Sequence, residues 1–488
     1  MSDEKLTLDF DIVIVGAGIS GINFAYRLQE RNPELSFIIL EGRDDIGGTW
    51  NLFQYPGIRS DSDLYTFGFP WRPWQERASI AEGDKIIAYM RECMTMYGID
   101  KRIHFRHQVK SADWSSSEKA WTLSLNADGK DTAMKSRFVL MCTGYYDYTT
   151  PLQTVIPGLE NFKGRIVHPQ FWPKDLDYAD KDMAIIGSGA TAITLLPALA
   201  EKARHVTMVQ RSPSYVLSQP REDGLERLIR AWVPTRWVHA AIRFKWLAVP
   251  FLFINFCRLL PGTAKSLLQK ATKAQLPPQL TVDPHFNPRY NPFEQRMCFC
   301  PDGDFYRALR KGKASVVTGR IDAVTANGIR LDDGREILTD IIVTATGLKL
   351  RIAGGINLTV DGTHLNPNEK YMWKNIMLED MPNLFYVIGY VDASWTLGAD
   401  ATAQLVCRML KAMAKKGQLA ATPRMDAATR ARGHDQPILK LTSTYIAAAK
   451  DTLPKVCDQP QWQGRTTYFR DIWEAWFGNI NKGIVYSA

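Results

Sequence analysis

Two glycine-rich turns constrain this chain most, because each follows a short apolar strand and opens a helical pattern. The first, Gly16-Ala17-Gly18-Ile19-Ser20-Gly21, follows the β-branched run at residues 11–15; the second, Gly187-Ser188-Gly189-Ala190-Thr191-Ala192, follows residues 183–186. Strand, glycine turn and helix in this order bind a dinucleotide, because the backbone can approach the pyrophosphate closely and the helix N-terminus attracts its charge. Two such units predict an α/β chain with two Rossmann-like dinucleotide-binding domains.

The strand after each turn indicates which nucleotide binds there. The strand at residues 36–40 ends at Glu41, about 20 residues after the first turn, where an acid accepts hydrogen bonds from ribose hydroxyls. The strand at residues 205–209 ends without an acid, in Gln210-Arg211-Ser212-Pro213. Arg211 can pair with a 2′-phosphate, which favours NADPH over NADH, although a surface ion pair would also explain this arginine.

Size and charge restrict the class of protein further. A chain of 488 residues with 45% apolar residues suggests two or three globular domains. The net charge of +9 suits phosphate-rich cofactors or an anionic membrane surface, and without an arginine-rich run or a nucleic-acid module we expect no nucleic-acid partner. Seven scattered cysteines indicate reduced thiols in a cytoplasm, and Cys298-x-Cys300 is too sparse for zinc, so no metal site is predicted.

The stretch from 223 to about 276 is helical, aromatic and basic in pattern. It contains an apolar run at residues 247–256 that is too short to span a bilayer and is interrupted by Pro250. We interpret it as a helical insert that covers the active site, or as an interfacial segment that draws apolar substrates from a membrane. The two interpretations are compatible.

Between the two turns lies the segment Phe162-Lys163-Gly164-Arg165-Ile166-Val167-His168-Pro169-Gln170-Phe171-Trp172-Pro173. It fits the pattern Phe-x-Gly-x-x-x-His-x-x-x-Trp-Pro. Together with Arg59-Ser60-Asp61 and Gln295-Arg296, it resembles the superfamily of flavin-containing and Baeyer–Villiger monooxygenases, over residues 10 to 400. The details are most similar to its bacterial ethionamide-activating group. Many relatives have lysine where this chain has Gln295, which puts one contact to the NADPH phosphate in doubt.

The resemblance implies a division of the chain. An FAD-binding domain is expected in two parts, residues 1–150 and 336–488, the second including a tail to which we assign no function. Residues 151–335 are expected to bind NADPH. His168 is interpreted as a structural or hinge residue that couples the two domains; the alternative role is that of a base.

The resemblance also implies the site. Arg296 matches the active-site arginine, and Asp61 lies near the flavin and orients Arg296. Expected contacts to FAD are made by Gly16, Gly18, Ser20, Gly21, Glu41, Gly48, Thr49, Trp50, Asn51, Leu52, Arg59, Ser60, Asp61 and Val109, where a strand from 103 is expected to turn. Expected contacts to NADPH are made by Gly187, Ser188, Gly189, Ala190, Thr191, Ala192, Ile193, Arg211 and Ser212.

The implied reaction uses NADPH to reduce FAD, which adds O2 to give a C4a-peroxyflavin that converts lipophilic ketones to esters or lactones and also oxidises sulfides or thioamides. Alternatives are a flavin monooxygenase limited to S- or N-oxygenation or to long-chain alkane oxidation, an uncoupled NADPH oxidase, and a non-enzymatic flavin-binding membrane partner. The expected partners are a small ketone or sulfide and O2. The expected location is the cytoplasm, with possible peripheral membrane contact through the insert.

Overall fold

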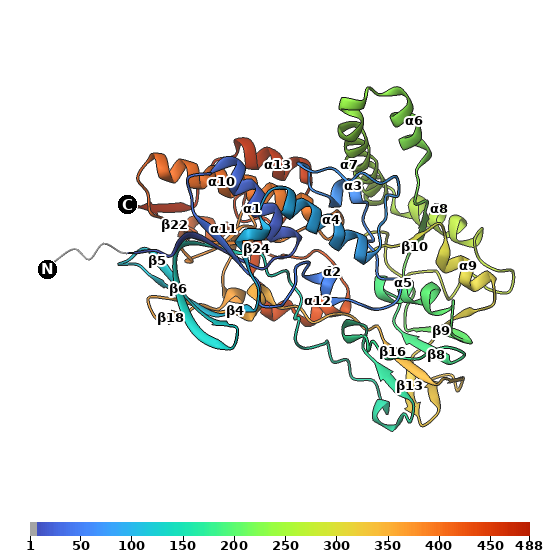
Figure 1. Ribbon diagram of the computed structural model, residues 1–488. Coiled ribbons are helices and arrows are strands. Elements are labelled where there is room, and N and C mark those ends of the chain that lie inside the picture. The colour runs from blue at the N-terminus through green and yellow to red at the C-terminus, as the bar shows by residue number, and fades with distance from the viewer. Residues whose placement is uncertain (1–6) are drawn as a thin grey trace.

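The computed structural model describes residues 7–488. Residues 1–5 contain no apolar signal core, so we expect no secretion signal there, and they lie outside the described part of the chain. Two β-sheets of nine and five strands organise the molecule, and each carries one of the glycine-rich turns. Figure 1 shows the larger sheet and its helices on the left and the second sheet at the lower right. The predicted α/β fold with two Rossmann-like sheets is confirmed.

The nine-stranded sheet has a parallel part and an antiparallel part. Its parallel strands, in spatial order, are β3 (Ile103–His104), β2 (Phe37–Leu40), β1 (Phe10–Val15), β6 (Lys130–Met141) and β21 (Leu384–Tyr386). The antiparallel part adds β5 (Ala120–Ala127), β4 (His107–Ser115), β17 (Asn357–Val360) and β18 (Thr363–His364); among these only β4 and β17 run parallel. The central part of this sheet is apolar and buried at residues 12–15 of β1, 37–40 of β2 and 138–141 of β6, because helices and further strands cover both of its faces.

One predicted turn is misplaced in this sheet. The chain turns at Arg106, whose φ is +55°, between β3 and β4, and not at Val109. Val109 lies inside β4 and is buried.

Helices from distant parts of the chain cover one face of the larger sheet. They are α1 (Ile19–Arg31), α4 (Gly83–Met96), α10 (Trp395–Lys415) and α13 (Tyr468–Phe477), with the short α2 (Thr49–Leu52) and α3 (Leu64–Phe67) beside them. The guanidinium of Arg27 on α1 donates to the Asp400 carboxylate on α10 at 2.7 Å, and both side chains are buried. This pair joins the first and second parts of the predicted FAD domain.

The second sheet is parallel throughout, in the order β12 (Ala314–Thr318), β9 (His205–Gln210), β8 (Asp182–Ile186), β16 (Ile341–Thr344) and β7 (Arg165–Val167). Helices α5 (Ala190–Leu199) and α9 (Asp304–Arg310) pack beside it. Short strands complete this half: β10 (Val216–Gln219) pairs with β11 (Cys298–Pro301), and a three-stranded sheet contains β13 (Ile321–Thr325), β14 (Gly328–Leu331) and β15 (Glu336–Leu338).

Two connections join the halves, and they pair with each other. They are residues 142–164, after β6, and residues 345–356, before β17. Tyr146 forms an antiparallel bridge with Leu350, and the Asp147 N–H donates to the Lys349 carbonyl at 2.8 Å. We call this pair of strands the connecting ribbon.

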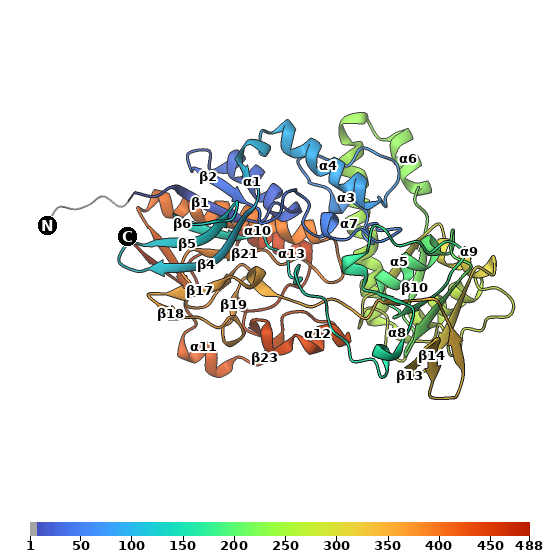
Figure 2. The same cartoon turned by 60° about the horizontal axis from the view of Figure 1, so that its bottom comes forward.

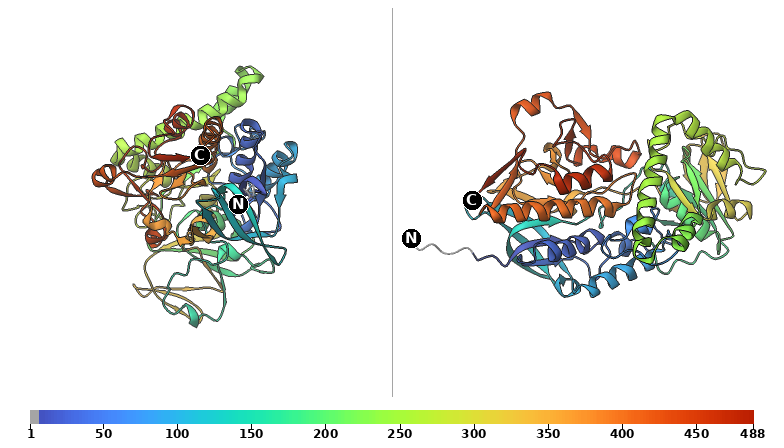
Figure 3. Two further views of the ribbon diagram at one scale, coloured as in Figure 1. Left: turned by 90° about the vertical axis from the view of Figure 1, so that its left-hand side faces the viewer. Right: turned by 90° about the horizontal axis from the view of Figure 1, so that it is seen from above.

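Three helices, α6 (Gly224–Trp232), α7 (Thr235–Leu259) and α8 (Pro261–Lys273), form the insert, and α6 with the start of α7 projects from the body (Figures 1 and 3). The apolar run 247–256 is not an isolated segment, because α7 continues through Pro250 for 25 residues. Within residues 7–488, α7 is the one helix whose length and composition would allow it to cross a membrane. The Arg243 guanidinium ties α7 to the body of the protein by donating to the Tyr65 carbonyl, and the Trp246 indole ties α7 to α6 by donating to Glu226, both at 2.6 Å.

The C-terminal region folds back on the larger sheet. It consists of β22 (Ala420–Pro423), α11 (Ala427–Arg432), β23 (Asp435–Pro437), α12 (Thr444–Ala448), β24 (Lys455–Cys457), α13 and β25 (Ile484–Ser487). The small strands β19 (Met372–Trp373) and β20 (Met377–Leu378) lie beneath it. Figure 2 shows that α12 reaches from this region toward the second sheet.

Candidate active site

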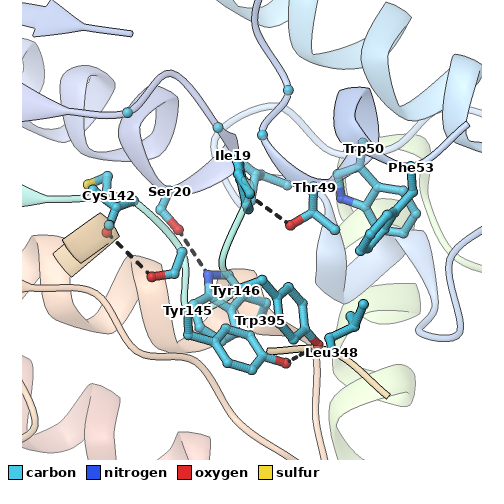
Figure 4. A pocket seen from close by; sticks show the side chains of 18 of the residues that line it. Ile19, Ser20, Thr49, Trp50, Phe53, Cys142, Tyr145, Tyr146, Leu348 and Trp395 are labelled. Carbon is cyan, nitrogen blue, oxygen red and sulfur yellow. Dashed lines mark hydrogen bonds between the residues drawn. The ribbon is translucent and has the colours of Figure 1, made fainter. Parts of the chain in front are cut away.

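A cavity of about 790 Å³ lies where the glycine-rich turn after β1 meets the connecting ribbon and α2. Figure 4 shows side chains from these segments around it. Its volume is in the range of pockets that hold cofactors. Among the residues predicted to bind cofactor or to act in catalysis, it is lined by Gly16, Gly18, Ser20, Glu41, Gly48, Thr49, Trp50, Arg59, Ser60, Asp61, Val109, Ala190, Thr191 and Arg296.

The first turn forms a cradle that side chains would fill. Gly16 has φ +108°, and a Cβ there would lie 2.6 Å from the Cys142 carbonyl oxygen. A Cβ on Gly21 would lie 2.0 Å from the Gly16 carbonyl oxygen. Gly21 does not line the cavity; it allows α1 to pack closely against the turn, so that the N-terminus of α1 faces the cavity.

Glu41 holds the turn in shape. Its carboxylate accepts hydrogen bonds from the backbone N–H groups of Ala17 at 2.8 Å and of Arg43 at 3.0 Å. It is buried and also lines the cavity. The acid therefore stands at the expected edge of the sheet, with part of its hydrogen-bonding capacity used by the backbone.

One wall of the cavity consists of aromatic residues that the sequence analysis did not select. Tyr145 stacks on Trp395 with 4.9 Å between ring centroids, and the Trp395 indole donates to the Ser20 hydroxyl at 2.9 Å (Figure 4). The hydroxyls of Tyr145 and Tyr146 are 2.6 Å apart. The available sequence signal was a pair of tyrosines four and five residues after the buried end of β6.

Asp61 and Arg296 meet across the cavity. Asp61 lies before α3 and Arg296 before β11, and the carboxylate Oδ2 and guanidinium Nη2 are 2.6 Å apart. The Asp61 carboxylate holds the pKa of Arg296 well above its ordinary value, so the guanidinium stays charged at any working pH. Within residues 7–488, Asp61 is the one carboxylate paired with Arg296.

A second cavity, of about 170 Å³, begins on the other side of this ion pair. Asp61 and Arg296 line both cavities. The walls of the second are largely apolar and come from α7, the loop before β11 and the C-terminal region; they include Trp246, Pro250, Phe251, Ile254, Phe293, Leu397, Leu441 and Phe469. A permanent positive charge thus stands between a large cavity on the glycine turn and a small apolar one.

Three residues of the first predicted set have other local roles. Asn51 donates from its side chain to Asp45 at 3.1 Å, and neither Asn51 nor Leu52 lines the large cavity. Arg59 does line it, but its guanidinium is buried and pairs with Asp304 on α9 at 2.5 Å. Arg59 therefore joins the two halves of the molecule.

The second turn reaches the large cavity only through Ala190 and Thr191 at the start of α5. Gly187, Ser188, Gly189, Ala192, Ile193, Arg211 and Ser212 line neither cavity. The Ser188 hydroxyl donates to the Ser212 carbonyl at 2.9 Å, and the exposed Arg211 donates to the Thr444 hydroxyl at 3.3 Å. Gly189, Arg211 and Ser212 are exposed and form a separate surface next to the cavity wall, whereas Ala192 and Ile193 are buried in α5.

His168 is half-buried at the base of the ribbon. Its Nδ1 accepts from the Gln170 N–H at 3.2 Å, its Nε2 is buried without a hydrogen-bond partner, and burial lowers its pKa. The Gln170 side chain donates to the Asp147 carbonyl in the ribbon at 2.6 Å. The motif at residues 162–173 is thus attached to the connection between the halves, as its interpretation as a hinge requires. Within residues 7–488, no group of three or more His, Cys, Asp or Glu side chains is arranged to hold a metal ion.

Comparison with known proteins agrees with this architecture. Residues 10–233 match the model of the flavin-binding monooxygenase-like family. The FAD-containing monooxygenase EthA of Mycobacterium tuberculosis is 44% identical over 471 residues, which cover 96% of this chain and 95% of that protein.

Solved structures share the fold at much lower identity. An oxidised steroid monooxygenase bound to NADP superimposes with a TM-score of 0.75 at 20% identity, covering 98% of this chain and 99% of that one. OTEMO in complex with FAD and NADP gives 0.73 at 18% identity, covering 99% and 100%. On the strength of the identity to EthA over nearly the whole length of both proteins, this chain belongs to the family of flavin-binding monooxygenases.

Proposed function

We propose that this protein is an FAD- and NADPH-dependent Baeyer–Villiger monooxygenase that uses O2 to convert lipophilic ketones to esters or lactones and that also oxidises sulfides. The observation that carries the proposal is the Arg296–Asp61 pair at the junction of the two cavities. A relative 44% identical is named an FAD-containing monooxygenase, which supports the flavin as cofactor.

The large cavity fits FAD. Its glycine cradle leaves no room for a Cβ at Gly16 or Gly21, it opens at the N-terminus of α1, and it has Glu41 at the end of β2. These are the features that hold a pyrophosphate and a ribose. FAD, when bound, supplies the redox chemistry and the activation of O2, which no side chain in the site provides.

NADPH suits the surface at the second turn. Arg211 is exposed at the end of β9, where no acid would repel a 2′-phosphate, and its guanidinium has a neutral partner, the Thr444 hydroxyl. A planar guanidinium binds phosphate oxygens in a bidentate manner, and a phosphate would replace the hydroxyl as the better acceptor. NADPH bound there would approach the wall formed by Thr191 and Thr194.

Arg296 is the electrostatic centre of the proposed reaction. Its fixed charge stabilises negative charge that develops on oxygen between the two cavities, and it needs no proton transfer to do so. Asp61 fixes the direction of the guanidinium. The aromatic wall of Tyr145 and Trp395 limits the entry of water, which strengthens the field of the charge.

The small cavity is the proposed site for the substrate. Its apolar walls favour lipophilic groups, and Arg296 at its inner end places a carbonyl or sulfur next to the cofactor cavity. Burial of the substrate in this cavity would favour binding by roughly 25 cal/mol for each Å² of apolar surface removed from water.

The function includes peripheral contact of the otherwise cytoplasmic enzyme with a membrane through the insert. Trp232 on α6 is 83% exposed, and Trp237, Phe244 and Leu252 on α7 are more than half exposed. The last three follow at intervals of seven and eight residues, which places them on one face of the helix. Further along α7, Phe251 and Ile254 line the small cavity, so the same helix carries exposed apolar residues and part of the substrate site.

Flotation with vesicles of anionic phospholipid tests this contact. The double variant Trp232→Ser/Trp237→Ser should lose binding that the wild-type protein shows, whereas Leu338→Ser, which changes an equally exposed residue on β15, should not. Equal flotation of both variants, or none by the wild type, would contradict the membrane contact.

Product analysis tests the reaction itself. Purified holoenzyme would receive NADPH, ¹⁸O2, a long-chain methyl ketone and an aryl methyl sulfide together. One ¹⁸O atom in the ester confirms the proposal. Labelled sulfoxide without ester would restrict the enzyme to heteroatom oxygenation, and peroxide as the sole product would replace the proposal with NADPH oxidase activity.

A further inference from the structure

A segment of the C-terminal region, residues 441–445, lies against the active site although it is far from it in sequence. Leu441 lines the small cavity together with Arg296. We call this stretch the tail segment; it leads into α12, which Figure 2 shows reaching across to the second sheet.

The tail segment is fastened to the loop that carries Arg296. The backbone N–H and the hydroxyl of Thr442 both donate to the Glu294 carbonyl, each at 3.2 Å. That loop is a tight turn: the Glu294 N–H donates to the Asn291 carbonyl at 3.1 Å, and Phe293 has φ +69°. A double hydrogen bond two residues before Arg296 restricts where the arginine backbone can lie.

Tyr445 packs the same segment against the ribbon. It belongs to one apolar cluster with Tyr145 and Tyr146, the tyrosines of the cavity wall. Gly347 makes room for it: a Cβ on Gly347, whose φ is +117°, would lie 3.0 Å from the Tyr445 Cβ. The ring therefore fills a space between the two connections.

The charge of Arg296 also reaches Tyr445. The guanidinium lowers the pKa of this phenol, but burial has the larger effect and raises the pKa to about 12, so Tyr445 stays neutral. Tyr145, Tyr146 and Tyr445 all interact electrostatically with Arg296, and Tyr445 lines neither cavity. Its position is behind the site, where it supports groups that touch the ligands.

We propose that the tail segment positions Arg296, with Tyr445 and Thr442 as the positioning residues. Tyr445 fixes the tyrosine wall beside the guanidinium, and Thr442 fixes the loop from which the arginine extends. The C-terminal region would thus determine how well the site directs oxygen into the substrate. This effect on catalysis rests on the proposed oxygenase function, whereas the placement of Arg296 does not.

The first test measures the placement directly. Holoenzyme would be treated with phenylglyoxal, a reagent for arginine, and the modification rate of Arg296 followed by peptide mass spectrometry. Tyr445→Ala should raise this rate several-fold and leave the exposed Arg204 unchanged. Tyr486→Phe, which removes a phenol elsewhere in the C-terminal region, is the matched control.

The second test is kinetic. Because a displacement of about 1 Å in a positioning group can cost about 100-fold in rate, a partial displacement in Tyr445→Ala should lower kcat about 10-fold. KM for the ketone should stay the same, and the share of NADPH lost to peroxide should rise. Thr442→Val should lower kcat and raise the share of NADPH lost to peroxide by smaller amounts. Thr442→Ser, which keeps the hydroxyl, should give the wild-type values.

The outcomes separate the two proposals. Unchanged Arg296 modification in Tyr445→Ala would overturn the positioning role, whether or not the wild type makes ester. Faster modification in a protein that makes no ester would support the positioning role and contradict the proposed reaction. If Tyr445→Ala fails to fold, as detected by circular dichroism, Thr442→Val with Thr442→Ser as its control decides on the same readouts, and unchanged Arg296 modification in Thr442→Val would then overturn the positioning role.

Discussion

Replacing Asp61 with asparagine should lower the oxygenation rate about 30-fold while leaving flavin bound. Asparagine keeps the shape of the side chain and removes the charge, so Arg296 loses its one paired carboxylate at 2.6 Å. The guanidinium stays protonated because an arginine does not lose its proton in proteins. Its direction, however, is no longer fixed toward the junction of the cavities.

The structure sets the magnitude. Removing one partner of a buried ion pair costs about 3–5 kcal/mol of folding free energy, and an ion pair exposed to solvent contributes about 0–1 kcal/mol. The side chains of Arg296 and Asp61 are 40% and 28% exposed, between these limits. An intermediate value is about 2 kcal/mol. If the fixed direction of the guanidinium stabilises the transition state by this amount, the oxygenation rate falls about 30-fold, because about 1.4 kcal/mol of activation free energy equals a factor of ten. Arg296→Met, which removes the charge itself, should cost about 10²–10³-fold.

The assay is kcat/KM for a ketone with saturating NADPH, together with flavin content from the absorbance of the purified protein. If Asp61→Asn keeps wild-type kcat/KM while Arg296→Met loses activity, Asp61 does not orient the arginine. If both variants keep activity, the ion pair is not the electrostatic centre of the reaction.

Three further predictions concern the two cofactor sites and Asp63, a buried acid that precedes α3 and accepts a hydrogen bond from the Thr66 N–H. Gly21→Ala should yield protein without bound flavin, measured by absorbance, because its Cβ would lie 2.0 Å from the Gly16 carbonyl oxygen. Arg211→Gln should raise KM for NADPH about tenfold or more and leave KM for NADH unchanged, through the loss of a charge-assisted phosphate contact; an equal rise for both would contradict the assignment. Burial raises the pKa of Asp63 to about 6. Ionisation of this acid therefore destabilises the folded protein, and the destabilisation is absent below pH about 4 and reaches its full size above pH about 6. Asp63→Asn should therefore gain about 1–3 kcal/mol relative to wild type between pH 4 and 7 in urea unfolding, and a difference independent of pH would refute this.

The parts of the fold that local sequence dictates could be predicted. A β-branched strand, a glycine turn and a helix form from neighbouring residues, so both turns lie where the pattern placed them, one on each sheet. The turn predicted at Val109 was misplaced because the local sequence does not mark the position at which the chain turns. The chain turns at Arg106 with a positive φ, and no glycine or asparagine marks that position.

The parts of the site that depend on distant partners could not be predicted from pattern. Arg59 is expected at the cofactor by resemblance and lines the large cavity, but its pairing with Asp304, 245 residues away, could not be predicted from the local pattern. Trp395 meets Ser20 over 375 residues, and Thr442 meets Glu294 over 148. Such pairs form when the two sheets and the C-terminal region pack together. No short stretch of sequence contains both partners.

The connecting ribbon has a mechanical consequence. Hydrogen bonds between residues 145–147 and 349–351 make the two connections move together when the halves rock against each other. Because Tyr145 and Tyr146 belong to the ribbon, any rocking shifts the phenols beside Arg296 at the same time. Joining the halves by two strands also means that a single backbone cut in one of them, near residue 155, leaves the other intact, so a nicked enzyme should stay assembled while its motion becomes less constrained.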